Sequence, residues 1–64
     1  MTAAWPRLMD RKTAGEYLLV SEWVIRQYRD AGDLPVTKIR SLERYDRNDL
    51  DALVDRLKIA DGAA

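Results

Sequence analysis

Residues 10–32 read DRKTAGEYLLVSEWVIRQYRDAG, and this stretch decides which fold we expect. Apolar residues recur at helical spacing within residues 11–19, and the Asp10 carboxylate can accept hydrogen bonds from the first free amides of that helix. Ser21 is a suitable N-cap for a second helix over residues 22–31, which Gly32 can end in a left-handed conformation. Two helices joined by about three residues must cross steeply, so the stretch predicts a helix-turn-helix.

The second predicted helix has two unlike sides. If Ile25, Tyr28 and Gly32 face the core, the helical period places a different set of residues on the opposite side. That outer set is Trp23, Arg26, Gln27 and Asp30. An exposed tryptophan on a small domain indicates an interface, and the alternative is that Trp23 folds back onto the core.

The chain after residue 32 predicts a hairpin and a third helix. Residues 36–39 and 42–45 alternate in polarity around the polar pair Arg40-Ser41, which is typical of a short β-hairpin. A lone hairpin is only marginally stable, so we expect it to pack on the helices through Val36, Ile39 and Tyr45 or their neighbours. Asp46 then begins a last helix, with Asp49 in a capping-box-like position. Its apolar stripe is formed by Leu50, Leu53, Val54 and Leu57.

The chain is short enough for a single domain with one small core. We expect an N-terminal arm over residues 1–7, a folded domain over residues 8–58 and a short flexible tail that frays over residues 59–64. Trp5, the one large apolar residue of the arm, is expected to pack over the edge of the core.

The residue inventory argues against an enzyme and against a cofactor or metal protein. The 64 residues include no cysteine and no histidine, which removes thiolate nucleophiles, disulfides and the commonest general base and metal ligand. The carboxylates after residue 45 follow helix capping and the solvated side of an amphipathic helix, so we interpret them as structural. We therefore expect no catalytic residues, no metal, no cofactor and no small-molecule substrate.

The charge pattern is neutral overall but uneven. Apolar residues make up 47% and charged residues 34%, as in folded domains, and no apolar run is long enough to span a bilayer or to form a signal peptide. We expect a cytoplasmic protein without membrane contact. Eleven basic and eleven acidic residues cancel, which argues against binding nucleic acid by bulk charge alone. The part up to Tyr45 is mildly basic and the remainder is acidic.

Three segments in this order resemble the excisionase family, within the winged-helix group related to MerR-type regulators. They are AGEYLLVS at residues 14–21, GDLP at residues 32–35, and RY at 44–45 followed by DL at 49–50. The resemblance covers roughly residues 8–57 and implies a mainly α fold with a small β-hairpin, a winged helix-turn-helix. The chain departs from the family pattern at Leu19, where glycine is usual, and at Asp30, where a basic residue is usual. We expect Leu19 to give a slightly different turn with an extra apolar contact.

The resemblance implies an architectural protein that binds double-stranded DNA. Its second helix would enter the major groove, and its hairpin wing would lie along the minor groove or the backbone. In the excisionase family several copies bind repeated attachment-site sequences, bend the DNA and direct a phage integrase toward excision in a bacterial host cell. Because a 64-residue monomer covers about one half-site, we also expect self-association on DNA, preferably head to tail.

The resemblance allows a residue-by-residue prediction of the interface. Arg26 and Gln27 are expected to contact bases, since arginine pairs with guanine and glutamine with adenine, although a solvated helix face is the alternative. The full recognition-helix set is Glu22, Trp23, Arg26, Gln27 and Asp30. The predicted DNA-backbone contacts are Arg11, Lys12, Ser21 and Arg44, and the predicted wing contacts are Lys38, Arg40 and Ser41. Arg29 and Arg44 could instead pair with a nearby acid such as Asp33 or Glu43.

Two other functions compete with the excisionase hypothesis. A small transcriptional regulator of the same fold would bind DNA without altering an integrase reaction. A protein-interaction module without a DNA role is suggested by the zero net charge and by an exposed Trp23. Salt-sensitive binding to duplex DNA distinguishes this last hypothesis from the other two.

Overall fold

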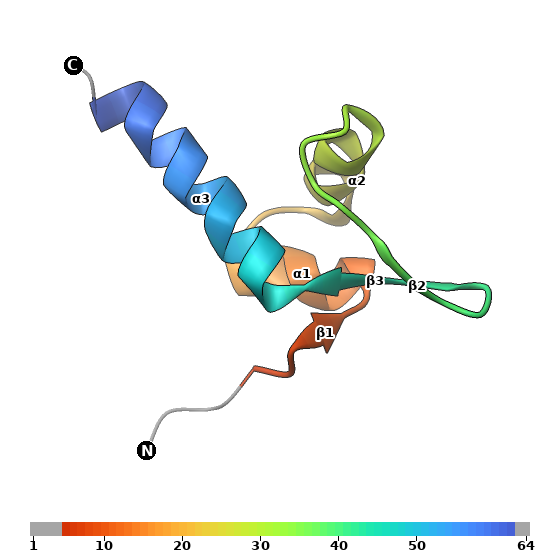
Figure 1. The fold of residues 1–64 in the computed structure, drawn as a ribbon. Helices are drawn as coiled ribbons and strands as arrows, with labels where there is room; N and C mark the ends of the chain where they lie inside the picture. The colour runs from red at the N-terminus through yellow and green to blue at the C-terminus, as the bar shows by residue number, and fades with distance from the viewer. Residues whose placement is uncertain (1–4, 63–64) are drawn as a thin grey trace.

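The computed structural model describes residues 5–62, with the side chains described up to Lys58. Three helices and three short strands make up this small mixed α/β fold (Figure 1). In chain order the elements are β1 (Leu8–Met9), α1 (Arg11–Leu18), α2 (Glu22–Asp30), β2 (Thr37–Ile39), β3 (Leu42–Asp46) and α3 (Arg47–Gly62).

Both predicted helix caps of the helix pair are present. The Asp10 carboxylate accepts a hydrogen bond of 2.8 Å from the Thr13 amide at the start of α1. The Ser21 hydroxyl accepts one of 3.3 Å from the Val24 amide at the start of α2. Gly32 follows α2 with a φ of 84°, the left-handed conformation expected where that helix ends. The sequence therefore located both helices to within one residue at each end.

The turn between α1 and α2 differs from the expectation at Leu19. This residue ends α1 in the left-handed conformation, with φ 59° and ψ 42°, and its amide donates to the Glu16 carbonyl. Its side chain is 90% exposed, so the predicted extra apolar contact is wrong. The left-handed backbone directs the side chain away from the core, because the chain reverses there.

Gly15 allows this turn to fold tightly onto α1. A Cβ atom at position 15 would lie 2.7 Å from the Val20 carbonyl oxygen, closer than real Cβ contacts allow. The Val20 amide donates to the Gly15 carbonyl at 2.8 Å, which fixes the close approach. The close approach of the α1–α2 turn therefore explains why a glycine stands at position 15 within α1.

The strands form a three-stranded antiparallel sheet in the order β1-β3-β2. The β2–β3 hairpin is as expected, with Thr37 opposite Arg44 and Ile39 opposite Leu42. The third strand was not expected: Leu8 pairs with Asp46 and Met9 with Tyr45. The fold is thus mixed α/β rather than mainly α with a hairpin alone, because a two-residue strand gives no alternation pattern in the sequence.

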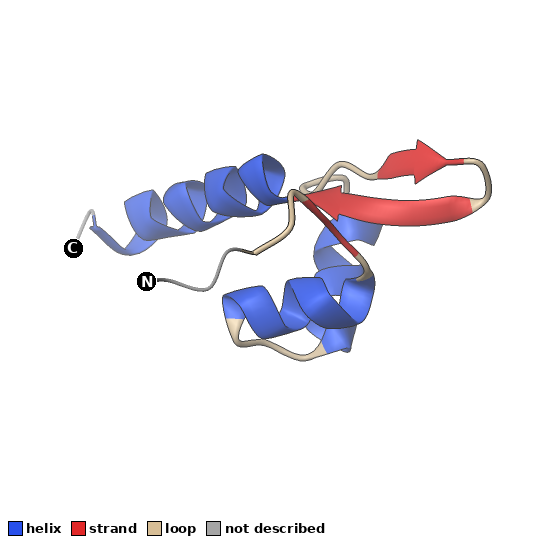
Figure 2. Ribbon diagram, turned by 90° about the horizontal axis from the view of Figure 1, so that it is seen from below, coloured by secondary structure: helices blue, strands red, loops and turns tan. Residues whose placement is uncertain are grey.

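The hairpin reaches the core only at its base. The core consists of Met9, Ala14, Ile25, Leu34, Tyr45, Leu50 and Leu53, with Val36 and Tyr28 among the partly buried residues packed against it. Of the residues expected to support the hairpin, Tyr45 and Val36 do so, whereas Ile39 is 47% exposed and does not. Gly32, set toward the core in the sequence prediction, is also exposed. The distal half of the hairpin projects past the helices, as Figure 2 shows.

The N-terminal segment and α3 cover the side of the molecule away from the hairpin. Trp5 packs edge-on against Tyr17 with ring centroids 5.2 Å apart, which agrees with its expected place at the core edge. The Tyr17 hydroxyl donates to Asp51 at 2.6 Å, and this hydrogen bond raises the pKa of Tyr17. Asp46 caps α3 by accepting from the Asn48 amide at 2.8 Å.

α3 continues further than expected. It runs to Gly62, so the tail predicted at residues 59–64 begins within the helix, while residues 63 and 64 lie outside the described residues. Residues 59–61 contain no proline or glycine that would end a helix earlier. Over the described residues, no helix combines the length and the apolar character needed to cross a membrane.

Candidate nucleic-acid interface

The outer side of α2 carries the exposed residues that its sequence predicted. Ile25 is completely buried beneath the helix. Trp23 is 64% exposed, so the alternative in which it folds back onto the core is wrong. Arg26, Gln27 and Asp30 are exposed as well. One short, N-capped helix therefore presents an aromatic ring, a guanidinium and an amide on a single side.

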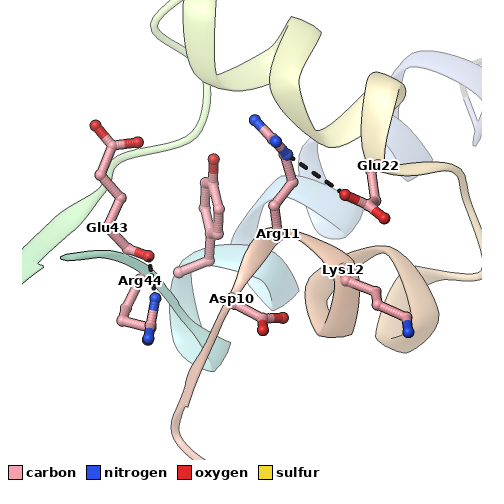
Figure 3. Close-up of a pocket in the computed structure, with 7 residues that line it drawn as sticks. Asp10, Arg11, Lys12, Glu22, Glu43 and Arg44 are labelled. Atoms are coloured by element: carbon pink, nitrogen blue, oxygen red, sulfur yellow. Dashed lines mark hydrogen bonds and ion pairs between the residues drawn. The ribbon is translucent and has the colours of Figure 1, made fainter.

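A hollow of about 300 Å³ lies between α1, α2 and β3 (Figure 3). Its lining brings together three of the four predicted backbone-contact residues, Arg11 and Lys12 from α1 and Arg44 from β3. The lining residues are Asp10, Arg11, Lys12, Glu22, Glu43, Arg44 and Tyr45. A second, smaller hollow continues from it along α2 and is lined by Arg11, Glu22, Trp23 and Arg26. The two hollows share Arg11 and Glu22, so Arg26 lies close to the predicted backbone contacts, whereas Ser21 and Gln27 line neither hollow.

The cations of this surface differ in how they are held. Arg11 extends toward α2 and pairs with Glu22, with Nε 3.7 Å from the carboxylate, whereas Lys12 points away from that pair (Figure 3). Arg44 donates from Nη1 to the Glu43 carbonyl at 2.9 Å and has no carboxylate partner among the described residues. The alternative in which Arg44 pairs with a carboxylate such as Asp33 or Glu43 is therefore wrong within the described residues, and its DNA-backbone contact stays a prediction.

The N-terminal end of α1 is negatively capped within this surface. The hydrogen bond from the Thr13 amide holds the pKa of the Asp10 carboxyl below its ordinary value of 3.8, so Asp10 stays ionised. This carboxylate satisfies the Thr13 amide and places a negative charge where the helix end would otherwise attract a phosphate. Phosphate attraction here would come from the Arg11 and Lys12 side chains rather than from the helix end.

Ion pairs link α2 to β3. Arg29 donates from Nη2 to Glu43 at 2.5 Å and from Nη1 to Asp30 at 3.0 Å. These two hydrogen bonds, first the one to Asp30 and then the one to Glu43, raise the pKa of Arg29. Arg26 is 3.5 Å from the other oxygen of Asp30. Of the partners considered for Arg29, Glu43 is therefore correct and Asp33 is not.

The predicted wing residues lie apart from the hollow. Lys38, Arg40 and Ser41 are exposed at the far end of the hairpin, and none of them lines either hollow. Arg40 has a φ of 59°. For any residue that has a Cβ atom, this backbone conformation is unfavourable in free energy. Two-residue hairpin turns favour positive φ at this position and usually place glycine or asparagine there.

Three residues that line the hollow, Asp10, Glu43 and Tyr45, were not predicted as site residues, and one predicted site residue has a structural role. Tyr45 and Glu43 line the hollow from β3, where the sequence marked them only as strand residues and a possible ion-pair partner. Ser21, a predicted backbone contact, uses its hydroxyl to cap α2. Among the described residues no three acidic side chains are grouped so that they could hold a metal ion.

No protein-family model matches this sequence, and neither the curated proteins nor the solved structures give a match.

Proposed function

We propose that the protein is a winged helix-turn-helix domain that binds double-stranded DNA, with α2 as the recognition helix. The observation that carries this proposal is the outer side of α2, where Trp23, Arg26 and Gln27 are exposed together on a capped helix. Arginine and glutamine match the hydrogen-bonding edges of guanine and adenine in the major groove. An α-helix of nine residues fits that groove when it crosses its partner helix steeply.

The surroundings of α2 support a DNA-backbone contact on one flank. Arg11, Lys12 and Arg44 line the hollow next to the helix, where phosphates would pass if α2 entered the groove. The β2–β3 hairpin would be the wing. At the tip of the wing, Arg40 occupies a backbone conformation that favours glycine. The presence of an arginine at this strained position supports a role for its side chain in contacting DNA.

Within this class we propose an excisionase-like role in the cytoplasm of a bacterial host. Several copies would bind repeated attachment-site sequences head to tail, bend the DNA and direct a phage integrase toward excision, without catalysis or cofactor. The zero net charge supports cooperative binding, because a neutral domain gains little affinity from bulk electrostatics. A transcriptional regulator of the same fold would bind DNA equally well but would leave the integrase product ratio unchanged.

The proposal is tested by titrating wild type and Arg26→Ala onto duplexes that carry the attachment-site arms flanking the gene, at about 50 mM and about 200 mM salt. We expect stepwise, salt-sensitive shifts, and a loss of about 5- to 150-fold in affinity for Arg26→Ala because one base contact is removed. Adding the cognate integrase to the same duplexes then separates an excisionase, which raises the yield of excision, from a regulator.

Lys58→Ala is the matched control. It removes the same charge from an exposed position on α3, where Lys58 pairs with Asp55 at 3.7 Å. If the two variants lost the same affinity for DNA, the contribution of Arg26 would be that of a nonspecific charge only. No binding by wild type at low salt would overturn the DNA-binding proposal.

The exposed apolar residues favour a second candidate, a protein-interaction module. Leu19 is 90% exposed, and it lies four residues before Trp23 on the same corner of the molecule. Exposed apolar groups of this size are typical of protein interfaces. This candidate predicts no salt-sensitive binding to duplex DNA, so the titration described above decides between the two.

A further inference from the structure

Four charged residues form a continuous chain from the hairpin to the outer side of α2. Glu43 of β3 pairs with Arg29, Arg29 pairs with Asp30, and Asp30 pairs with Arg26 at distances of 2.5, 3.0 and 3.5 Å. The two arginines occupy different oxygens of the Asp30 carboxylate. The last member of this chain is the residue proposed to contact a base.

The inner part of the chain is better fixed than an ordinary surface ion pair. The Arg29 and Glu43 side chains are 36% and 33% exposed, and both terminal nitrogens of Arg29 are occupied by different acids. The Arg29 Nε is buried. A guanidinium is planar, so fixing two of its nitrogens also fixes the direction in which it holds Asp30.

We propose that Asp30 is a positioning residue for Arg26, and that it sets the sequence selectivity of α2 at the expense of affinity. This inference rests on the proposed function. Asp30, anchored through Arg29 to Glu43, holds the Arg26 guanidinium in one place on the helix surface. Asp30 lowers the positive charge on the DNA-facing side of α2, and in this proposal it also belongs to the residues that recognise the DNA sequence.

The physical reason is that an arginine side chain without a partner is long, flexible and able to reach several phosphates. Such contacts increase affinity for every DNA sequence alike. A carboxylate beside the guanidinium repels phosphates and leaves the outward nitrogens of Arg26 available for a bidentate contact with one base. Selectivity is a difference between two affinities, so weakening nonspecific binding raises it.

The competing interpretation is that Asp30 is an ordinary exposed acid. Exposed ion pairs contribute little to stability, and the removal of such an acid would raise affinity for all sequences equally. The two interpretations therefore differ in which base preferences change when the charge of Asp30 is removed.

The experiment selects bound molecules from a pool of duplexes with a randomised centre, and sequences them for wild type, Arg26→Ala and Asp30→Asn. The carboxamide keeps the size of the side chain but removes its charge. We expect Asp30→Asn to bind the unselected pool about 2- to 10-fold more tightly at low salt. We also expect it to lose base preference at the same positions that Arg26→Ala loses.

Two further variants make the result interpretable. Asp55→Asn makes the same chemical change in the exposed Lys58 pair on α3, and it should leave the selected sequence unchanged. Glu43→Gln breaks the chain of ion pairs at its anchored end without altering α2. It should weaken the base preference at the same positions of the DNA site, but to a smaller extent. Thermal unfolding of each variant checks that the fold is retained.

The proposal is overturned if Asp30→Asn selects the wild-type sequence with every preference intact, whatever its affinity. It is also overturned if Asp30→Asn loses preferences at positions that Arg26→Ala retains. If wild type enriches no sequence at all, the proposed DNA-binding function fails first, and that result is distinct from either of the others.

Discussion

At the scale of single residues, Leu19 and Arg40 share an unusual backbone. Each has a φ of 59°, and the other described residue with positive φ is a glycine. The left-handed conformation costs a residue with a Cβ about 1–2 kcal/mol relative to its preferred region. Neither residue recovers this free energy by packing, because both side chains are exposed.

Replacing Leu19 with glycine should therefore stabilise the isolated protein. We expect the free energy of unfolding to rise by about 0.5–1 kcal/mol, since relief of the backbone exceeds the entropy that glycine adds to the unfolded chain. Urea denaturation of wild type and Leu19→Gly measures this difference. A lower stability of the variant would mean that the Leu19 side chain packs against the protein in solution.

The Asp10 cap predicts a specific acid sensitivity. Its folded-state pKa is lowered below 3.8, chiefly by the hydrogen bond from Thr13, so the ionised carboxylate stabilises the fold above that value. This contribution is lost as the pH falls below 3.8 through the lowered folded pKa. Asp10→Asn keeps the capping oxygen but not the charge, so wild type should be the more stable protein at neutral pH. Thermal unfolding from pH 7 to pH 2 should show that the difference disappears in acid, whereas a constant difference would contradict this role.

At the scale of elements, the α1–α2 corner depends on a backbone contact that only glycine allows. Gly15→Ala would place a methyl group 2.7 Å from the Val20 carbonyl oxygen. Although alanine favours a helix by about 1 kcal/mol over glycine, we expect a net loss of about 1–3 kcal/mol in unfolding free energy. Chemical denaturation tests this expectation.

Glu16→Ala provides the control for Gly15→Ala, because Glu16 is an exposed neighbour on α1 and its replacement should change stability by less than about 0.5 kcal/mol. If Gly15→Ala were as stable as wild type or more so, the turn would have to relax away from α1 at little cost.

The elements that the sequence predicted are those with a local signal. Asp10 and Ser21 indicate where the first two helices begin, and the spacing of Leu50 and Leu53 indicates the last helix. These signals are local, because caps and periodicity are properties of neighbouring residues. β1 escaped prediction because two residues contain no period. Its existence depends on the pairing of Met9 with Tyr45, which are distant in the sequence.

The candidate site divides in the same way. The exposed side of α2 follows from helical geometry, so Arg26 and Gln27 were placed correctly on the surface. The hollow required the packing of α1, α2 and β3, so the approach of Arg11 to Glu22 could not be read from a sequence. The exposure of Leu19 was predicted wrongly because its direction depends on one backbone angle rather than on its residue type.

At the scale of the whole molecule, charge is distributed so that part of the proposed interface is neutralised from within. Arg11 and Arg26 each lie within 4 Å of an acid of α2. The other proposed contact cations have no carboxylate partner within the described part of the chain: Lys12, Lys38, Arg40 and Arg44. Their positions run from the start of α1 to the tip of the hairpin, so they extend along the molecule.

The number of these free cations predicts the salt dependence of DNA binding. If each of the four neutralises one phosphate, a plot of log affinity against log salt concentration should have a slope of about −4 per bound copy. Fluorescence anisotropy over a range of salt concentrations measures it. Replacing Lys38 and Arg40 together with alanine should reduce the slope by about two. An unchanged slope in that double variant would exclude a backbone contact by the hairpin tip.

The tip of the hairpin also bears on how this protein can evolve. A lineage that must only fold would gain by exchanging Arg40 for glycine, since that exchange relieves the backbone and removes only an exposed side chain. A lineage that must hold DNA would keep the cation. Position 40 therefore records which of the two requirements has been enforced: a mutant library sorted for protease resistance should drift toward glycine there, and one sorted for DNA capture should retain arginine.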